Sequence, residues 1–492
     1  MSKLAPVARS SWRSATIRPI SAVSDSTVLV MSRSSTRRFG FLAANIAPGM
    51  RLETREPSGS DVRASIDSDL TAGTLRRTGT ELRVGAPGEL DADGLRTAAA
   101  LAARSLRDEG GTIAWHAEDA EQVRAIVEGT AFGAYDPGLF KRDYANRPEL
   151  TLALAAPSGL SELAGRQAAI VRHLDAARDL ANRPPNDLTP VALTAHAKSH
   201  LQPHLTVESY GRNWIEDQGM GAFAAVAAGS GEEPQLIVMR YDPPGAPEDV
   251  TLGLVGKAIT FDSGGISLKP PLRMQDMKGD MCGGAAVIEG TAAIAELGLP
   301  VRLLTVVAST ENVQDGKAYK PGDILRAANG KTIEIINTDA EGRLLLADAL
   351  HYTRENGATH VIDFATLTGA MSIALGDLYA GWFANDDEFA VQVDAAAQTS
   401  GEHAWRFPLH PRYRRYVDSD FADMKNGSEL RQAGAVLAAE FLREFTGEGP
   451  WAHFDIAGPA YLSRKRPDYA LDQGGTGYGV RLIVELAQRF AA

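Results

Sequence analysis

The chain has 492 residues, of which 44% are hydrophobic and 23% charged, and this is the composition of an ordinary globular protein. Its length exceeds one typical hydrophobic core, so two domains are expected. The formal net charge of −12 argues against broad attraction to nucleic acid or anionic lipid. The one cysteine, Cys282, excludes an intramolecular disulfide and a Cys-rich zinc site, and it fits a reducing, cytoplasmic compartment. No apolar run approaches the ~20 residues that a membrane span needs.

Residues 1–38 differ in composition, because they are rich in Ser and Arg and contain Asp25 as the only acid. We expect a disordered tail here, or a start codon placed too early with Met31 as the true start. A transit peptide is the third interpretation, since such peptides share this composition. Secretion is not expected, because the segment lacks an apolar core followed by a small-residue cleavage site.

Residues 39–160 alternate β-rich runs with helical patterns, which predicts a small N-terminal α/β domain. Asp91 or Asp93 is a candidate cap for its first helix. The domain contains no cluster of His, Cys or carboxylate side chains that indicates chemistry. The predicted strands are 81–87, 111–117 and 149–157, and the predicted helices are 91–111 and 119–135.

A long helical pattern covers residues 161–183 and ends at Pro184 and Pro185, which predicts a connecting helix. Residues 184–492 form the second predicted domain. Its apolar strands are separated by helices, which predicts an α/β fold with a mixed, mainly parallel sheet flanked by helices. The predicted strands are 205–210, 235–241, 250–257, 301–310, 332–338 and 359–367, and the predicted helices are 191–201, 284–298, 343–357 and 435–445.

Charged side chains follow several of these strands, and ligands of such sheets bind at the carboxyl ends of strands. Asp262 follows one buried strand, and Asp339 and Glu341 follow another. Asp276 and Asp280 are four residues apart and would share a helical face. A single acid in such a place is more often a helix cap or a solvated turn residue. The group as a whole is harder to explain in that way, because buried charges need partners.

These carboxylates supply more ligands than one divalent ion needs, which predicts two ions bridged by shared oxygens. Without His or Cys, such a site suits Mn²⁺ or Mg²⁺ and accepts Zn²⁺. Lys257 is either a neutral metal ligand or the ion-pair partner of a carboxylate, and the residues alone favour the ion pair. Lys269 lies in a looser loop and is expected to stay cationic, facing a developing negative charge. Arg343 has a planar fork that suits a carboxylate or carbonate.

Other catalytic patterns are absent or incomplete. Ser263 lies in FDSGG without the G-x-S-x-G turn that exposes a nucleophilic serine. Residues 251–258 lack the first Gly and the final Ser or Thr of a phosphate-binding loop. H-E-x-x-H is absent from the sequence.

At the residues of the carboxylate cluster the sequence resembles the cytosolic leucine aminopeptidase family of two-metal aminopeptidases. NTDAEGRL at 337–344 is the signature octapeptide of this family, and GKAITFDSGGISLK at 256–269 follows its GK-x-x-TFDSGG-x-S-x-K pattern. Ala258 is the one local departure, since many members have Gly there. The resemblance covers residues 183–482, is weaker in the first domain and is absent from residues 1–38.

The resemblance implies a leucyl aminopeptidase, a metallo-exopeptidase hydrolase that releases leucine-like N-terminal residues from peptides with a two-metal-activated water. It implies two divalent ions per subunit, Mn²⁺ or Zn²⁺. Lys269 would polarise the scissile carbonyl, and Arg343 would hold a bicarbonate as general base. One ion would be held by Lys257, Asp262, Asp280 and Glu341, and the other by Asp262, Asp339 and Glu341.

The resemblance also implies a homohexamer and a small, apolar pocket for the first side chain of the substrate. A basic first residue should be a poorer substrate, because no carboxylate belongs to that pocket. The pocket residues are Met277, Thr366, Gly369, Ala457 and Ala460.

Two other functions are considered. Some members of this family also bind DNA, but such a role needs a basic stripe, and the acidic charge balance makes nucleic acid an unlikely main partner. A phosphoesterase with the same metals is disfavoured, because the basic residues match a peptide site residue for residue.

Overall fold

The computed structural model of the protein describes residues 43–47, 50–85, 90–430, 432–470 and 472–491. The interpretations of residues 1–38 lie outside the described residues. The remainder, Phe41–Ala492, forms one compact unit with two large sheets. The domain boundaries at residues 160 and 183 therefore stay a prediction.

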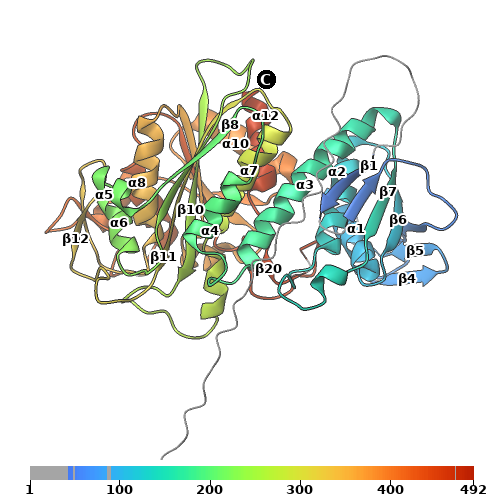
Figure 1. Ribbon diagram of the computed structural model, residues 1–492, viewed down its shortest axis with the longest axis horizontal. Helices are drawn as coiled ribbons and strands as arrows, with labels where there is room; N and C mark the ends of the chain where they lie inside the picture. Colours follow the sequence, from blue (N-terminus) through green and yellow to red (C-terminus); the bar gives the residue numbers. More distant parts are fainter. Residues whose placement is uncertain (1–42, 48–49, 86–89, 431, 471, 492) are drawn as a thin grey trace, which may run out of the picture. The chain divides into compact units, whose positions relative to one another are not determined.

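An eight-stranded mixed sheet forms the core of the C-terminal region, as predicted (Figure 1). β10 (Thr251–Asp262) lies in its interior and pairs in parallel with both of its neighbours, β11 and β14. Strands added at the edges are antiparallel to their neighbours at three places, which makes the sheet mixed. In spatial order the strands are β16 (Ala404–Arg406), β15 (Ala380–Ala384), β18 (Trp451–Asp455), β14 (His360–Ala365), β10, β11 (Arg302–Asn312), β9 (Gln235–Tyr241) and β8 (Leu205–Tyr210).

Helices cover both faces of this sheet and bury two separate hydrophobic clusters. Leu252 and Leu254 of β10 belong to one cluster and Val255 and Ile259 to the other, because successive side chains of a strand point to opposite faces. The first face carries α3 (Ser161–Asn182), α4 (Pro190–Lys198), α7 (Cys282–Glu296), α10 (Asp387–Ser400) and α12 (Val480–Phe490). The second face carries α5 (Arg212–Asp217), α6 (Gly221–Ala227), α8 (Gly342–Glu355), α9 (Gly369–Leu375) and α11 (Gly434–Arg443).

The N-terminal region has its own seven-stranded mixed sheet. Two helices, α1 (Ala92–Leu106) and α2 (Ala120–Ala134), pack on it, and the Asp91 carboxylate caps α1 by accepting from the Gly94 amide. In spatial order the strands are β1 (Ala43–Ala47), β2 (Met50–Glu53), β7 (Leu150–Ala155), β6 (Gly111–His116), β3 (Val62–Ile66), β5 (Glu81–Val84) and β4 (Leu75–Thr78). The α/β fold predicted for this region is therefore confirmed.

One predicted strand does not join the main sheet. The expected strand at 332–338 is reduced to β13 (Thr332–Glu334), which pairs with β12 (Ile324–Arg326) and β17 (Met424–Lys425) in a three-stranded sheet. Side-chain alternation predicts that residues are extended but not which sheet they join. Asp339 and Glu341 therefore follow a small peripheral sheet, and a loop carries them to the main sheet. A two-stranded sheet, β19 (Tyr461–Leu462) with β20 (Gly474–Gly475), completes the fold.

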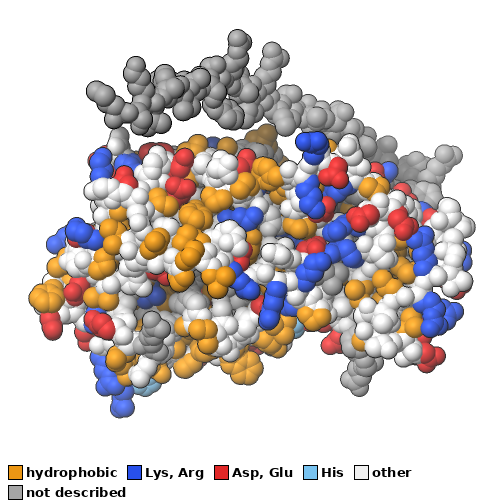
Figure 2. Space-filling view, turned by 90° about the horizontal axis from the view of Figure 1, so that it is seen from below, with side chains coloured by type: hydrophobic (Ala, Val, Ile, Leu, Met, Phe, Trp, Pro, Cys, Tyr) orange, Lys and Arg blue, Asp and Glu red, His pale blue; other side chains and the backbone are white. Residues whose placement is uncertain are grey.

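Figure 2 shows one face of the molecule, on which Lys and Arg side chains lie among Asp, Glu and hydrophobic side chains. Strong non-specific binding of nucleic acid depends on positive charge gathered along the path of the phosphates. The mixture of charges on this face gives no support to a nucleic-acid partner. No helix in the described part of the chain is both long and apolar enough to cross a membrane.

A buried ion-pair network joins the helices of the N-terminal region to the last helix of the chain. The Glu128 carboxylate on α2 accepts from Arg96 Nε of α1 at 2.7 Å and from Arg481 Nη1 of α12 at 2.5 Å. Its other oxygen accepts from Gln167 Nε2 of α3 at 2.7 Å. All four side chains are buried, so the carboxylate neutralises charge that water cannot reach.

The substitution Glu128→Gln should lower the free energy of unfolding by about 3–5 kcal/mol, because two buried guanidinium groups lose their shared anion. Urea denaturation followed by circular dichroism measures this loss. Glu121→Gln, exposed on the same helix, is the matched control and should change stability by less than about 0.5 kcal/mol. Equal stability of the two variants would contradict the role given to the network.

Candidate active site

Lys257 lies within β10, and its side chain points to the face of the sheet that α8 covers. It is two residues from Val255 and two from Ile259, which both belong to that face. The side chain is only 2% exposed, and its Nζ lies 2.8 Å from each of Asp280 Oδ1, Glu341 Oε1 and the Thr366 carbonyl oxygen. Lys257 thus forms ion pairs with two carboxylates, which is the alternative to metal ligation that the residues alone favoured.

Gly342 is the residue that allows this approach. A β-carbon at this position would lie 2.6 Å from Lys257 Cε and 2.8 Å from its Nζ, closer than real contacts permit. The presence of glycine at this position of the NTDAEGRL segment is therefore explained by the lack of space for a side chain. It lets the first turn of α8 lie directly against the lysine side chain.

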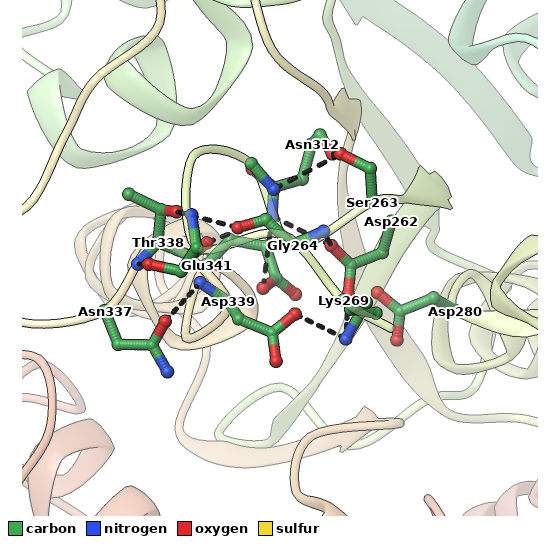
Figure 3. A network of polar contacts seen from close by, with 12 residues as sticks. Asp262, Ser263, Gly264, Lys269, Asp280, Asn312, Asn337, Thr338, Asp339 and Glu341 are labelled. Atoms are coloured by element: carbon green, nitrogen blue, oxygen red, sulfur yellow. Dashed lines mark hydrogen bonds and ion pairs between the residues drawn. The ribbon is translucent and has the colours of Figure 1, made fainter. Parts of the chain in front are cut away.

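Asp262 is the last residue of β10, and the turn that follows fixes its carboxylate. Gly264 has φ of +87° and donates its amide to Asp262 Oδ1 at 2.8 Å. The same oxygen accepts from Asn312 Nδ2 at 2.8 Å, and Asn312 is paired with Asp262 at the end of β11. Asn312 Nδ2 also donates to the Thr338 carbonyl oxygen at 3.0 Å, so one amide ties the β10 end to the loop that carries Asp339 (Figure 3).

Lys269 returns from the loop after β10 to lie between two carboxylates. Its Nζ is 2.7 Å from Asp262 Oδ2 and 2.5 Å from Asp339 Oδ1. In Figure 3 the carboxylates of Asp262, Asp280 and Asp339 are grouped around this amine. Its side chain is 21% exposed, so unlike Lys257 it faces a space that solvent reaches.

The acids Asp276 and Asp280 do not share a helical face as predicted. Residues Met274–Gly279 form a 3-10 helix. Asp280 directly follows this helix and lies two residues before the start of α7. With three residues per turn, positions four apart no longer lie above one another. Asp280 Oδ1 accepts from Lys257 and from Thr366 Oγ1 at 2.7 Å, whereas its buried Oδ2 has no hydrogen-bond partner among the described residues.

The cluster is short of positive charge. Burial raises the pKa values of Asp280, Asp339 and Glu341, and the negative charge of Asp262 adds to this effect in all three. Burial lowers the pKa of both Lys257 and Lys269, but the neighbouring carboxylates overcome this and hold each pKa above its ordinary value. Two ammonium groups thus face four carboxylates, and further cationic charge would stabilise their ionised forms.

Arg343 lies beside the cluster, in the first turn of α8. Its Nη1 donates to the Asn426 carbonyl oxygen at 2.8 Å, and its buried Nε has no hydrogen-bond partner in the described part of the chain. Burial lowers the pKa of the guanidinium to about 10, so it stays charged at neutral pH. A buried, partly unpaired guanidinium is a suitable site for a small anion.

A cavity of about 320 Å³ opens onto the cluster. All five predicted metal ligands and Lys269 line it, whereas Arg343 is not among its lining residues. Four of the predicted pocket residues also line it: Met277, Thr366, Gly369 and Ala457. Ala460 does not, since it is 1% exposed and its carbonyl oxygen accepts from Cys282 Sγ.

Some lining and supporting residues were not predicted to belong to the pocket. Asp276, one of the acids singled out in the sequence, lines the cavity, so the cavity contains a carboxylate besides those of the cluster. Tyr461 and Ser463 line it from the far C-terminal part of the chain. Asn312 supports Asp262, and its position at the end of a buried strand is a signal that could have indicated it.

Asp262, Asp280 and Glu341 bring carboxylate oxygens within 4.8 Å of one another, which is the arrangement that a metal ion requires. The unpartnered oxygen of Asp280 and the lack of positive charge fit a divalent cation. Fold and site together define an α/β protein whose oxygen-rich, largely buried cluster fits a divalent metal ion.

Comparison with known proteins agrees with this class. A family model described as the cytosol aminopeptidase family, catalytic domain, matches residues 175–484. A probable cytosol aminopeptidase of Koribacter versatilis is 46% identical over 376 residues, which cover 75% of this chain and 73% of that protein. One from Agrobacterium fabrum is 41% identical over 463 residues, which cover 88% and 91%. The solved structure of the bottromycin maturation enzyme BotP in complex with Mn is 34% identical, with a TM-score of 0.79, and covers 88% of this chain and 100% of that chain.

The chain belongs to the cytosol aminopeptidase family. It is therefore a metal-dependent peptidase that acts at the N-termini of peptides. The family resemblance noted in the sequence is confirmed.

Asn312→Ala removes the amide that holds Asp262 and the Thr338 carbonyl in place. It should lower the free energy of unfolding by about 1–3 kcal/mol, because one hydrogen bond to the Asp262 carboxylate and one to the Thr338 carbonyl are lost. Gly264 and Tyr319 still donate to these two oxygens. The substitution should also weaken metal binding by about 10–100-fold, as loss of a group that orients a ligand does. Metal titration of the chelated protein measures the second effect. Asn213→Ala, at an exposed position on α5, is the control, and equal metal affinities in the two variants would contradict this role.

Proposed function

We propose that the protein is a leucyl aminopeptidase that uses two divalent ions, Mn²⁺ or Zn²⁺, to hydrolyse the first peptide bond of peptides with a leucine-like N-terminal residue. The observation that carries this proposal is the group of four carboxylates, three of them buried, with only two ammonium groups beside it. When bound, the two ions supply Lewis acidity and a water of lowered pKa.

The residues present fit two ions. Asp262 and Glu341 would bridge them, Lys257 and Asp280 would complete one site, and Asp339 would complete the other. Lys257 is the least obvious ligand, since its ammonium group, which lies between Asp280 and Glu341, must lose a proton before its nitrogen can bind an ion. A dication beside a fully buried amine favours that loss.

Lys269 and Arg343 would act without holding metal. The Lys269 ammonium faces the cavity and would bind the scissile carbonyl oxygen and stabilise the negative charge that develops on it. Arg343 has an unpartnered Nε and would hold a bicarbonate, which when bound supplies a general base. The surrounding side chains exclude water, which would strengthen the interaction of Lys269 with the carbonyl oxygen and that of Arg343 with bicarbonate.

The substrate preference follows from the cavity lining. Met277, Gly369 and Ala457 present apolar or small surfaces that suit a leucine-like side chain. Asp276 is the lining group that could favour a basic side chain instead, so the preference is tested against lysine.

We also propose a cytoplasmic homohexamer, as the family resemblance implies.

The main test is hydrolysis of leucine p-nitroanilide by chelated protein after separate addition of Mn²⁺, Zn²⁺ and Co²⁺. We expect no activity without metal, restoration by Mn²⁺ or Zn²⁺, and kcat/KM at least about tenfold higher for leucine than for lysine p-nitroanilide, which corresponds to ~1.4 kcal/mol. Equal or better hydrolysis of the lysine substrate would overturn the leucine preference, and full activity after chelation would overturn metal dependence.

The two lysines should respond differently to substitution. Lys257→Arg keeps the charge but cannot coordinate, so metal content and activity should both fall. Lys269→Ala should keep both ions while kcat falls by about 100-fold or more, as for loss of one group that stabilises an oxyanion. Metal analysis beside kinetics separates the two outcomes. Lys317→Arg, at an exposed position, is the control. Full metal content in Lys257→Arg, or loss of metal from Lys269→Ala, would contradict the respective role.

A further inference from the structure

A second cluster of possible metal ligands lies away from the cavity, around Glu289 on α7. The Glu289 side chain is fully buried, and three histidine side chains surround its carboxylate. His173 Nδ1 lies 2.6 Å from Oε2, and His200 Nε2 lies 3.0 Å from Oε1. His196 Nε2 lies 2.5 Å from the same Oε1. None of these residues lines the candidate active site.

The cluster joins three segments of the chain. His173 comes from the middle of α3, which packs against α7, and His196 comes from α4, with His200 just beyond the end of that helix. Figure 1 shows α3, α4 and α7 on the same side of the main sheet. Four side chains from three segments of the chain thus converge on one point.

The second nitrogen of His173 is oriented in the way that metal-bound histidines are. His173 Nε2 lies 3.1 Å from Oε2 of Glu296, which is the last residue of α7. A neutral imidazole carries only one N–H, so it cannot donate to both carboxylates. Either His173 is doubly protonated, or a cation replaces the proton on Nδ1 while Nε2–H donates to Glu296. A carboxylate that receives the distal N–H of a ligating histidine is the usual support of a metal site.

We propose that His173, His196, His200 and Glu289 bind a divalent transition-metal ion, with Zn²⁺ as the preferred ion. The ligand atoms of His173, His200 and Glu289 already lie within 4.8 Å of one another. Three imidazole nitrogens and one carboxylate oxygen form a four-coordinate donor set that suits zinc, whereas Mn²⁺ and Mg²⁺ prefer oxygen. The imidazoles of His196 and His200 are 25% and 14% exposed, which leaves a path for the ion from solvent.

The role of this ion is structural. Its four ligands would all come from the protein, which closes the coordination sphere to substrate. It would link α3, α4 and α7, and α7 begins two residues after Asp280 of the candidate active site. Zinc at this position would therefore stabilise the scaffold behind the active site without taking part in the reaction.

The test uses the full chain, stripped of metal with EDTA, dialysed and loaded with Zn²⁺. X-ray absorption at the zinc edge detects imidazole scattering, and the residues lining the candidate active site include no histidine, so this signal separates zinc bound by histidines from zinc in the active site. We expect imidazole scattering from the wild-type protein, and zinc without imidazole scattering would overturn the proposal. This measurement needs no variant and does not depend on peptidase activity.

The double variant His196→Gln/His200→Gln tests the same site by stoichiometry. It should bind one zinc ion per chain less than the wild type, lose the imidazole scattering, and lose the rise in melting temperature that added Zn²⁺ gives the wild type. His116→Gln, at an exposed position on β6, is the control and should keep all three properties. Unchanged zinc stoichiometry in the double variant would overturn the proposal and would mark the cluster as a protonated histidine–carboxylate network.

Discussion

The site depends on the burial of several carboxylates together with two lysines at one edge of the main sheet. Asp262, Asp280 and Glu341 repel one another in a place where water cannot screen them. Lys257 and Lys269 reduce this repulsion from opposite sides, one inside the sheet and one from the open cavity. The surrounding backbone is shaped by the need to bring these groups together.

Two glycines allow the backbone to lie close to the charged side chains of the site. Gly342 lets the start of α8 lie against Lys257, and Gly264 turns the chain so that its own amide holds Asp262. A side chain at either position would push apart groups that stabilise one another through short contacts. Glycine is therefore needed at these two positions for steric and conformational reasons, apart from any chemistry.

The sequence predicted the main sheet and its central strand because apolar residues run almost without interruption through β10 and β11. It indicated Asp262, Asp339 and Glu341 because each follows a predicted strand, and their role as metal ligands stays a prediction. The sequence did not predict the features that depend on tertiary contacts. The run at 332–338 has strand periodicity, but nothing local indicates that β13 joins a separate sheet with β17, about 90 residues later in the chain. Asn312 was missed although it ends a buried strand, because its hydrogen-bond partners Asp262 and the Thr338 carbonyl are identified only once the fold brings them near.

The histidine cluster and the carboxylate cluster differ in the chemistry of their donors. They are nevertheless close in sequence, because Glu289 lies on α7 and Asp280 lies two residues before α7. The first offers mainly imidazole nitrogen, and the second offers mainly carboxylate oxygen. Imidazole ligands suit zinc, whereas carboxylate and water ligands suit manganese, so the two sites would differ in the ion that they favour. Zinc held by the histidines and manganese held by the carboxylates would then coexist on one chain. Total metal content alone would misstate the occupancy of the active site, and only a ligand-specific signal would separate the two.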